Sequence, residues 1–381
     1  MGPSEIEICT NCKRQIGRSE QAYVFKVMIL CAECDRQLRK PEMVSDKKKQ
    51  PKEETMFGWL QKKDWQSSPA YLLLMSKFRN GDSPTRYRDA DYWEAALKEK
   101  PAKVIEQFIK EEMLEPAELP ELLNYKFKAS DLKSMLKEKG LKVSGRKEEL
   151  IQRLIDNDAK AMSEATKGLD LYRCTAAGKH LAEHYLEGER IKREAAEQET
   201  LSLLEGEEYS KAVRVVAQYE ATQVFARGIG IDWKNYDGTS DVESLRVIFN
   251  TTPAILKGIE ENRRRQLRPA AGMMLLWGTS TARHWLPEGF ETGIHLDGDT
   301  ACRMLVFHAH HLRHIKEYKE LGCRTAEVEI SGAGDGATCS ECRKINGKKY
   351  RIENVPELPY AKCTSECGCR CTVLPVVGEF Q

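Results

Sequence analysis

The chain has 381 residues, of which 41% are hydrophobic and 31% charged, and its formal net charge is +1. This composition favours about two or three globular domains and excludes a disordered chain. Because the net charge is near zero, the whole surface does not carry a positive electrostatic potential, and any nucleic-acid contact must come from a local basic patch. No run approaches the roughly eighteen apolar residues of a membrane-spanning helix, and the N-terminus lacks the features of a secretory signal, so we expect an intracellular protein with no membrane partner.

Four cysteines near the N-terminus follow the pattern C-x2-C-x18-C-x2-C. They are Cys9, Cys12, Cys31 and Cys34. Each C-x2-C turn can present two sulfurs to one ion, and the spacing suits a tetrahedral zinc site. Because the residues between the pairs, 22–30, are strand-like, we expect a structural zinc finger of the zinc-ribbon or treble-clef type over residues 1–44. The alternative is two chance pairs or a redox dithiol.

The next segments are a tether and a helical region. Residues 45–56 are charged and contain Pro51, which is typical of a linker. Residues 57–124 carry apolar groups separated by Pro101, Pro116 and Pro120, and we expect a helical segment there.

Residues 125–160 have the pattern of two short amphipathic helices joined by a tight turn. Ser130 can cap the first helix, and Gly140 is placed to stop it. Ser144 and Gly145 would make the turn. Residues 126–156 hold nine Lys or Arg against five acids. The expected small core contains Leu132, Met135, Leu136, Leu141, Val143, Leu150, Ile151 and Leu154.

This hairpin closely resembles the SAP domain, a helix-turn-helix module that binds DNA, often with a preference for AT-rich sequence. The resemblance rests on Asp131-Leu132-Lys133, Leu136, Gly140-Leu141, Val143–Lys147, Glu149-Leu150 and Arg153-Leu154. It implies a DNA contact dominated by phosphates at the start of the second helix. The residues expected to make it are Lys133, Lys137, Ser144, Gly145, Arg146, Lys147 and Arg153. The alternative is a solvated basic face.

Beyond the hairpin we expect a wing-like segment and a charged helix over 161–208, then a helical domain over 209–324. Cys174 is most simply a small buried residue. Within the helical domain, a helix is expected over 253–276, and its arginines at 263–265 and 268 suit a solvated face better than a second nucleic-acid contact. A further helix over 299–321 carries His308, His310, His311 and His314. Their spacing could hold zinc, but no HExxH pattern is present, and an ordinary polar cluster is the favoured interpretation.

The last segment, 325–381, is rich in cysteine. A strand over 325–330 precedes the pair Cys339 and Cys342, and an Asn346-Gly347 turn and a second strand follow. Two further ligands must come from Cys363, Cys367, Cys369 and Cys371; Cys363 with Cys369 is the first choice, with Cys371 close behind. A second structural zinc ion is therefore expected here. A disulfide cluster is the alternative, and an intracellular protein disfavours it.

This C-terminal segment resembles the zinc element of the phage head-morphogenesis (minor capsid, Mu F-like) family. The matching features are the Cys339–Cys342 pair, residues 345–348, Pro356 with Pro359, and Cys369-Arg370-Cys371 before Leu374-Pro375-Val376. The His-Pro that precedes Cys-Arg-Cys in that family is replaced by residues 364–368. The ligand set and a capsid role therefore stay open.

Together these patterns predict a mainly α, multi-domain chain in which a helical body contains the SAP-like hairpin and small zinc-stabilised β-rich elements flank it at both termini. The favoured function is DNA binding with two structural zinc ions, in a cytoplasmic or virion-associated protein of a bacterium, phage or mobile element. A phage head or minor capsid protein is the alternative. A metal-dependent nuclease is disfavoured because the loop acids Asp232, Asp237, Asp241, Asp297 and Asp299 are more typical of turns than of a paired-carboxylate site.

Overall fold

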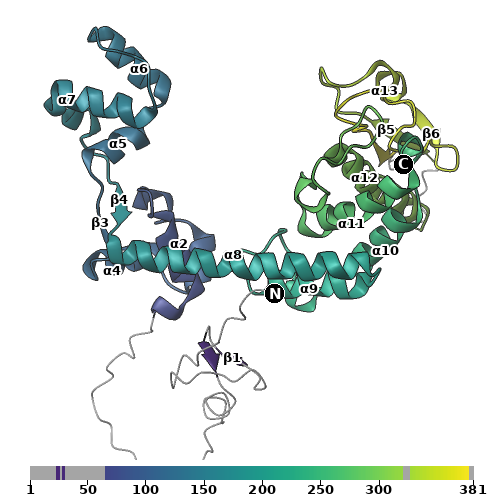
Figure 1. Ribbon diagram of the computed structural model, residues 1–381, viewed down its shortest axis with the longest axis horizontal. Coiled ribbons are helices and arrows are strands. Elements are labelled where there is room, and N and C mark those ends of the chain that lie inside the picture. Colours follow the sequence, from purple (N-terminus) through teal and green to yellow (C-terminus); the bar gives the residue numbers. More distant parts are fainter. Residues whose placement is uncertain (1–22, 26–27, 31–64, 321–326, 377–381) are drawn as a thin grey trace, which may run out of the picture. The chain divides into compact units, whose positions relative to one another are not determined.

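The computed structural model describes residues 23–25, 28–30, 65–320 and 327–376 (Figure 1). The chain divides into two compact units, Met1–Gln61 and Lys62–Gln381. In the first unit, β1 (Tyr23–Phe25) and β2 (Met28–Leu30) pair in antiparallel fashion. The predicted zinc ligands Cys9, Cys12, Cys31 and Cys34 and the predicted linker 45–56 lie outside the described residues.

The second unit is mainly helical. Its helices are α2 (Pro69–Lys77), α3 (Asp91–Leu97), α4 (Pro101–Lys110), α5 (Leu119–Lys126), α6 (Ala129–Glu138), α7 (Lys147–Thr166), α8 (Ala176–Glu205), α9 (Tyr209–Ala221), α10 (Thr239–Asn250), α11 (Glu261–Trp277), α12 (Gly298–Glu320) and α13 (Ser340–Ile345). Short 3₁₀ turns are η1 (Trp65–Ser67), η2 (Pro84–Arg86), η3 (Trp233–Asn235), η4 (Ala254–Leu256) and η5 (Arg283–Trp285). Among the described helices, none has the length and apolar content to cross a membrane.

The strands of this unit form two small antiparallel sheets. One is the ribbon of β3 (Leu114–Pro116) and β4 (Tyr172–Cys174), in which Leu114 lies opposite Cys174. The other has the order β6-β5-β7, with β5 (Glu327–Ser331) between β6 (Lys349–Arg351) and β7 (Thr372–Pro375). The strand predicted over 325–330 and the second strand after the Asn346-Gly347 turn were therefore predicted correctly in type, and β5 ends at Ser331.

The first hydrophobic core is rich in aromatic residues, and we call it the aromatic core. Its larger buried members are Trp65, Tyr71, Phe78, Tyr87, Trp93 and Phe108. They come from η1, α2, α3 and α4 and the segments between them, and Leu114 and Cys174 of the ribbon join them, so Cys174 is a buried thiol as expected. Helix α8 begins against this core, where a Cβ on Gly178 would collide with the carbonyl oxygen of Met113. The position therefore requires glycine.

The second core belongs to α5, α6 and α7, which are inserted between β3 and β4; we call residues 117–171 the inserted module. Its fully buried side chains are Leu123, Leu132, Leu136, Leu150 and Leu154. Helix α7 consists of two parts, because Asp158 has non-helical dihedral angles and its carboxylate accepts a hydrogen bond from the Ala161 N–H at 2.9 Å. The second part contributes Met162 to the same core. The predicted hairpin thus packs together with the helices before and after it.

Two details of the predicted hairpin are wrong. Helix α6 begins at Ala129 rather than after a Ser130 cap, and the carboxylate of Asp131 accepts a hydrogen bond from the Lys128 N–H at 2.8 Å. Val143 is 41% exposed instead of buried, because it lies in the loop between the helices, while Leu141 packs against the core. Gly140 ends the first helix as predicted, with a φ of 67°.

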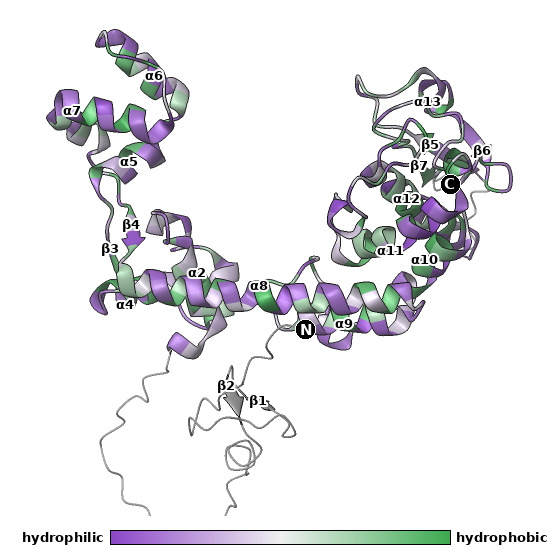
Figure 2. Cartoon of the chain, in the orientation of Figure 1, coloured by the Kyte–Doolittle hydropathy of each residue, from purple (hydrophilic) through white to green (hydrophobic). Residues whose placement is uncertain are grey.

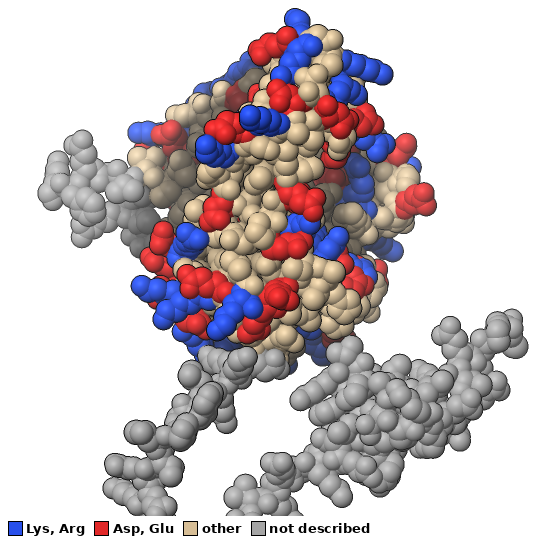
Figure 3. Space-filling view, turned by 90° about the vertical axis from the view of Figure 1, so that its left-hand side faces the viewer, with Lys and Arg blue, Asp and Glu red and all other residues tan. Residues whose placement is uncertain are grey.

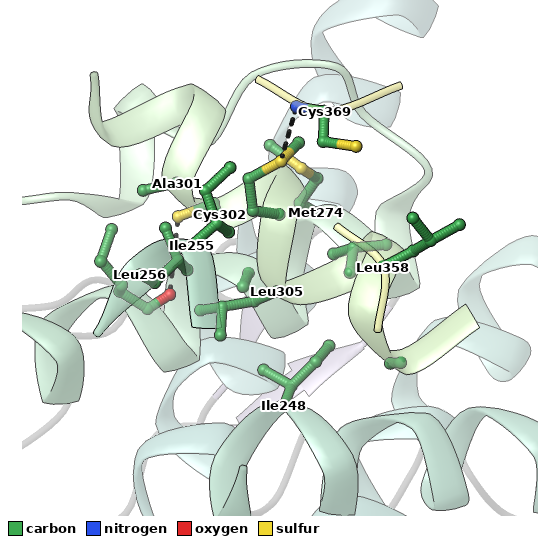
Figure 4. Packing of buried hydrophobic residues seen from close by; sticks show 14 of the residues in the cluster. Ile248, Ile255, Leu256, Met274, Ala301, Cys302, Leu305, Leu358 and Cys369 are labelled. Carbon is green, nitrogen blue, oxygen red and sulfur yellow. Dashed lines mark hydrogen bonds between the residues drawn. The ribbon is translucent and has the colours of Figure 1, made fainter. Parts of the chain in front are cut away.

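The third core joins the second half of α8 to α9–α12, the three-stranded sheet and α13. Figure 4 shows Ile248, Met274, Leu305 and Leu358 around its centre, with Cys369 nearby. Residues on both sides of the predicted boundary at 324 therefore share one core. The helix predicted over 253–276 begins only at Glu261, because the preceding residues form η4 and a turn. In Figure 2, hydrophilic and hydrophobic bands alternate along α8, which contacts α2 near one end and α9 and α11 farther along.

Candidate nucleic-acid interface and cysteine centre

Helices α6 and α7 and the loop between them carry the basic residues predicted to contact DNA. The side chains of Lys133, Lys137 and Arg146 are exposed, and no hydrogen bond or ion pair of these side chains is recorded among the described residues. Arg146 immediately precedes α7, where the first N–H groups of a helix have no carbonyl of the helix to bind. This places free positive charge beside a helix N-terminus.

Two other predicted contacts have a bracing role in the structure. Lys147 donates from Nζ to the carbonyl oxygen of Asn124 at 2.6 Å, which ties the start of α7 to α5. Arg153 donates to the carbonyl oxygens of Lys142 and Ser144, the second at 3.3 Å. Lys147 therefore stabilises the contact between α7 and α5, and Arg153 stabilises the backbone of the loop.

Ser144 and Gly145 lie at the exposed turn of this loop. Gly145 has a φ of 131°, and a Cβ there would collide with the Glu149 carboxylate. That carboxylate accepts a hydrogen bond from the Arg146 N–H at 3.1 Å. In Figure 3, which views this side of the unit, Lys and Arg side chains are interspersed with Asp and Glu, so the positive charge is confined to local patches.

Arg173 on β4 connects the ribbon to the inserted module, and the sequence did not single it out. It donates hydrogen bonds to Glu115 at 2.9 Å, to Glu118 at 2.7 Å and to Glu121 at 3.2 Å. The bonds to Glu121, then those to Glu115 and Glu118, raise the pKa of Arg173. The only signal in the sequence is the spacing of Glu118 and Glu121, which places one carboxylate at the N-cap of α5 and the other in its first turn.

Five cysteines of the C-terminal element come together. The sulfurs of Cys339, Cys342 and Cys363 lie within 4.8 Å of one another, and so do those of Cys342, Cys369 and Cys371. The Cys339 and Cys363 sulfurs are 3.8 Å apart, and those of Cys342 and Cys369 are 4.0 Å apart. Four thiolates about 2.3 Å from a tetrahedral zinc ion would be separated by about 3.8 Å. Each group of three sulfurs could hold a metal ion, and the separations of 3.8 and 4.0 Å are close to that value, whereas Cys367 is exposed and belongs to neither group.

The cysteine centre has one thiol that ionises easily and several that do not. Although burial opposes it, hydrogen bonds from the N–H groups of Cys342 and Thr364 lower the pKa of Cys339 to about 6. Burial raises the pKa of Cys342, and the contact with Cys369, followed by burial, raises the pKa of Cys363. The centre therefore combines Cys339, whose thiol has a lowered pKa, with Cys342 and Cys363, whose thiols have raised pKa values.

The loops around the cysteines are fixed by polar contacts. Arg370 and Asp335 form two hydrogen bonds, at 2.7 and 2.6 Å, and Ser365 donates to the carbonyl oxygen of Ala337 at 2.9 Å. The Cys369 N–H donates to the sulfur of Met304 on α12 at 3.3 Å, drawn as a dashed line in Figure 4. The positions of the cysteine sulfurs are therefore held by the contacts between the loop at 335–337 and the loop at 365–370, and by helix α12.

In the described part of the chain, no group of three possible metal ligands includes a histidine of α12. His308 lies 3.2 Å from the carbonyl oxygen of Leu358 through Nδ1, and His311 is buried. Burial lowers the pKa of His310 and of His311 to about 4. Every group of three or more possible metal ligands found among the described residues consists of cysteines. The favoured interpretation, a polar cluster, agrees with this packing.

The acids predicted to lie in loops have structural roles, but Asp241 and Asp299 lie in the first turns of helices α10 and α12 instead of in loops. Asp232 accepts from the Lys234 N–H at 3.1 Å, and Asp297 accepts from the Thr300 N–H at 2.7 Å. Asp299 accepts from the Ala282 N–H at 2.7 Å. Asp241 accepts from the Tyr236 hydroxyl at 2.9 Å, and burial raises its pKa. Each of these four carboxylates accepts a hydrogen bond that stabilises the local fold.

Comparison with known proteins identifies one part of the chain. Residues 126–159 match the family model of the SAP domain. The match begins at the end of α5 and ends beside the break in α7 at Asp158. Neither a comparison with curated proteins nor one with solved structures found a match. The chain therefore contains a SAP domain, which indicates nucleic-acid binding.

Proposed function

We propose that this chain, which carries a SAP domain within its inserted module, binds duplex DNA through the loop between α6 and α7. The observation that carries the proposal is the unpaired positive charge of Lys133 and Lys137 on α6 and of Arg146, which immediately precedes α7. DNA affinity of this kind comes mainly from neutralised phosphates and falls steeply with salt.

The remaining predicted residues would shape the contact. Ser144 and Gly145 would let the loop backbone approach a phosphate. Arg153 holds that loop through the carbonyl oxygens of Lys142 and Ser144, and Lys147 ties the start of α7 to Asn124 of α5. A preference for AT-rich duplex is part of the proposal, since minor-groove width and shape vary with base composition.

The test compares two double variants of the full chain on AT-rich and GC-rich duplexes. Lys137→Gln/Arg146→Gln should weaken binding about tenfold to both, because two phosphate contacts are lost. Lys103→Gln/Lys110→Gln removes the same charge from exposed positions on α4 and should change affinity less than about twofold. Unchanged affinity of the first variant on AT-rich duplex would contradict the proposal.

We further propose that Cys339, Cys342, Cys363 and Cys369 hold a structural zinc ion, with Cys371 as the alternative fourth ligand. The sulfur separations of 3.8 and 4.0 Å support this set. Four thiolates leave no open position for a substrate, so the ion would cross-link the loops around α13. Cys9, Cys12, Cys31 and Cys34 are proposed to hold a second ion.

A structural protein of a phage head is the second candidate function. The cysteine element shares one core with the long helices α11 and α12, which suits the resemblance to the head-morphogenesis family. In that case the SAP domain would meet packaged DNA in a virion, whereas a cytoplasmic protein would meet free DNA. Copurification with capsid or portal subunits supports the second candidate, and DNA binding without such subunits supports the first.

A further inference from the structure

A groove of about 870 Å³ lies between α9 and α10, at a distance in sequence from both the SAP domain and the cysteine centre. Helices α9 and α10 contact each other, and η3 lies against α9. Val213, Ala217 and Val242 supply its apolar lining, and Trp233 and Tyr236 line it from the η3 segment. The lining is therefore partly aromatic.

The lining also carries three cations without an ion pair within 4.0 Å among the described residues. Arg214 on α9, Lys234 in η3 and Arg246 on α10 are exposed, and no ion pair of their side chains within 4.0 Å is recorded among the described residues. Of the two acids in the lining, Glu243 pairs with Lys316 at 3.1 Å and Asp237 accepts from the Thr239 hydroxyl at 2.7 Å. An anionic ligand would meet free cations on both helices.

The arginine cluster at the start of α11 offers a contrast. Arg263 lies 3.9 Å from Glu260, Arg264 lies 2.7 Å from Glu261, and Arg265 lies 3.6 Å from Glu261. These cations are already paired within their own helix, as expected for a solvated face. The densest run of arginine in the sequence is therefore less available than the more widely spaced cations of the groove.

The aromatic rings of the groove are held in place before any ligand arrives. The centroids of Trp233 and Tyr236 are 4.7 Å apart. Trp233 donates from Nε1 to the carbonyl oxygen of Arg227 at 2.5 Å, and the Tyr236 hydroxyl donates to Asp241 at 2.9 Å. Trp233 is buried, whereas Tyr236 is half-buried and is the ring more accessible to a ligand. A fixed ring lowers the entropy cost of stacking.

We propose that the groove binds a single strand of nucleic acid, with Arg214 and Arg246 contacting phosphates and Tyr236 stacking on a base. A single strand fits because its bases are free to stack, whereas the bases of a duplex are already stacked on one another. Stacking tolerates any base, so this site would bind without strong sequence preference. The proposal is independent of DNA binding by the SAP domain.

The test measures binding of fluorescein-labelled oligothymidylate to the full chain by anisotropy at several salt concentrations. Arg214→Gln/Arg246→Gln should weaken binding about tenfold and make the slope of log K against log salt less steep by about 1.4, since each phosphate contact on a single strand contributes about 0.7. Arg264→Gln/Arg265→Gln removes equal charge from the paired cluster and should change affinity less than about twofold.

Two further arms complete the test. Lys137→Gln/Arg146→Gln, which disables the proposed SAP contact, should leave the effect of the groove variant intact. Equal losses from the two arginine double variants, or no loss from the groove variant, would overturn the proposal. Displacement of oligothymidylate by polyglutamate at matched charge concentration would also overturn it and identify an acidic protein as the partner. Melting temperatures within about 2 °C of the parent chain establish that each variant is folded.

Discussion

At the scale of single residues, the C-terminal element holds two thiols more than the four that a tetrahedral zinc ion binds. Cys342 belongs to both groups of neighbouring sulfurs, and its own burial is nearly complete. Cys367 is only a few residues from Cys363 and Cys369 but is exposed and outside both groups. Substitution by serine is therefore expected to affect metal binding at Cys342 but not at Cys367.

Cys342→Ser should abolish metal binding at the C-terminal centre, whereas Cys367→Ser should leave it intact. Native mass spectrometry of the full chain should show two zinc ions for the parent and for Cys367→Ser, and one for Cys342→Ser. Because a structural ion stabilises only the folded state, Cys342→Ser should also lower the melting temperature by roughly 10 °C. No metal in the parent chain, or equal loss from both variants, would contradict the assignment.

Zinc binding at this centre should strengthen as the pH rises. Cys339, with a pKa of about 6, is already a thiolate at neutral pH, while Cys342 and Cys363 have raised pKa values and are protonated. Zinc must displace the protons of the other three ligands, so about three protons leave per ion above pH 6, and about four below it. Competition with a chromophoric chelator between pH 5.5 and about 7.5 measures the slope. A pH-independent affinity would exclude a four-thiolate site.

At the scale of elements, a helix position that lies against the backbone of another segment has room for glycine but not for a larger residue. Gly178 and Gly188 both lie within α8, but only Gly178 faces the carbonyl oxygen of Met113. A Cβ on Gly188 would meet no atom within 4 Å. The same substitution should therefore have opposite effects at the two positions.

Gly178→Ala should destabilise the chain by about 1–3 kcal/mol, because the new methyl group forces α8 away from Met113. Gly188→Ala should stabilise it by about 0.5–1 kcal/mol, because alanine loses less backbone entropy in a helix. Urea unfolding followed by circular dichroism measures both changes. If Gly178→Ala were as stable as Gly188→Ala, the close packing of α8 on the ribbon would be wrong.

The elements also show how far the sequence could predict the structure. The hairpin, its apolar face and the Cys339–Cys342 turn follow from local spacing, and these expectations were correct. Val143 was misplaced because the path of an irregular loop, not periodicity, decides where its side chain points. Arg173 could not be found from spacing, since two of its partners, Glu115 and Glu121, are 58 and 52 residues away. The choice of Cys369 over Cys367 likewise depends on the fold.

At the scale of the whole second unit, the SAP domain lies in a module with its own core. The chain leaves the aromatic core through β3 and returns through β4. These two strands pair with each other, so the insertion begins and ends at neighbouring positions. The Ala117 N–H donates to the carbonyl oxygen of Leu171 at 2.9 Å, which continues the ribbon into the module. The buried residues of the aromatic core and of the inserted module form separate clusters.

Removing the module should therefore leave the rest of the chain folded. Replacing residues 118–170 with Asn-Gly joins Ala117 to Leu171 by a two-residue hairpin turn, which suits the antiparallel register of β3 and β4. Arg173 would keep Glu115 and lose Glu118 and Glu121, partly exposed ion pairs worth about 0–1 kcal/mol each.

The shortened chain should retain the cooperative thermal unfolding of the parent chain, with a melting temperature lower by no more than about 5 °C. Its affinity for duplex DNA should fall at least as far as that of Lys137→Gln/Arg146→Gln, since every proposed SAP contact is absent. Calorimetry and anisotropy measure the two properties on the same preparation. Loss of cooperative unfolding would mean that the aromatic core depends on the module, and unchanged duplex affinity would place the DNA contact elsewhere in the chain.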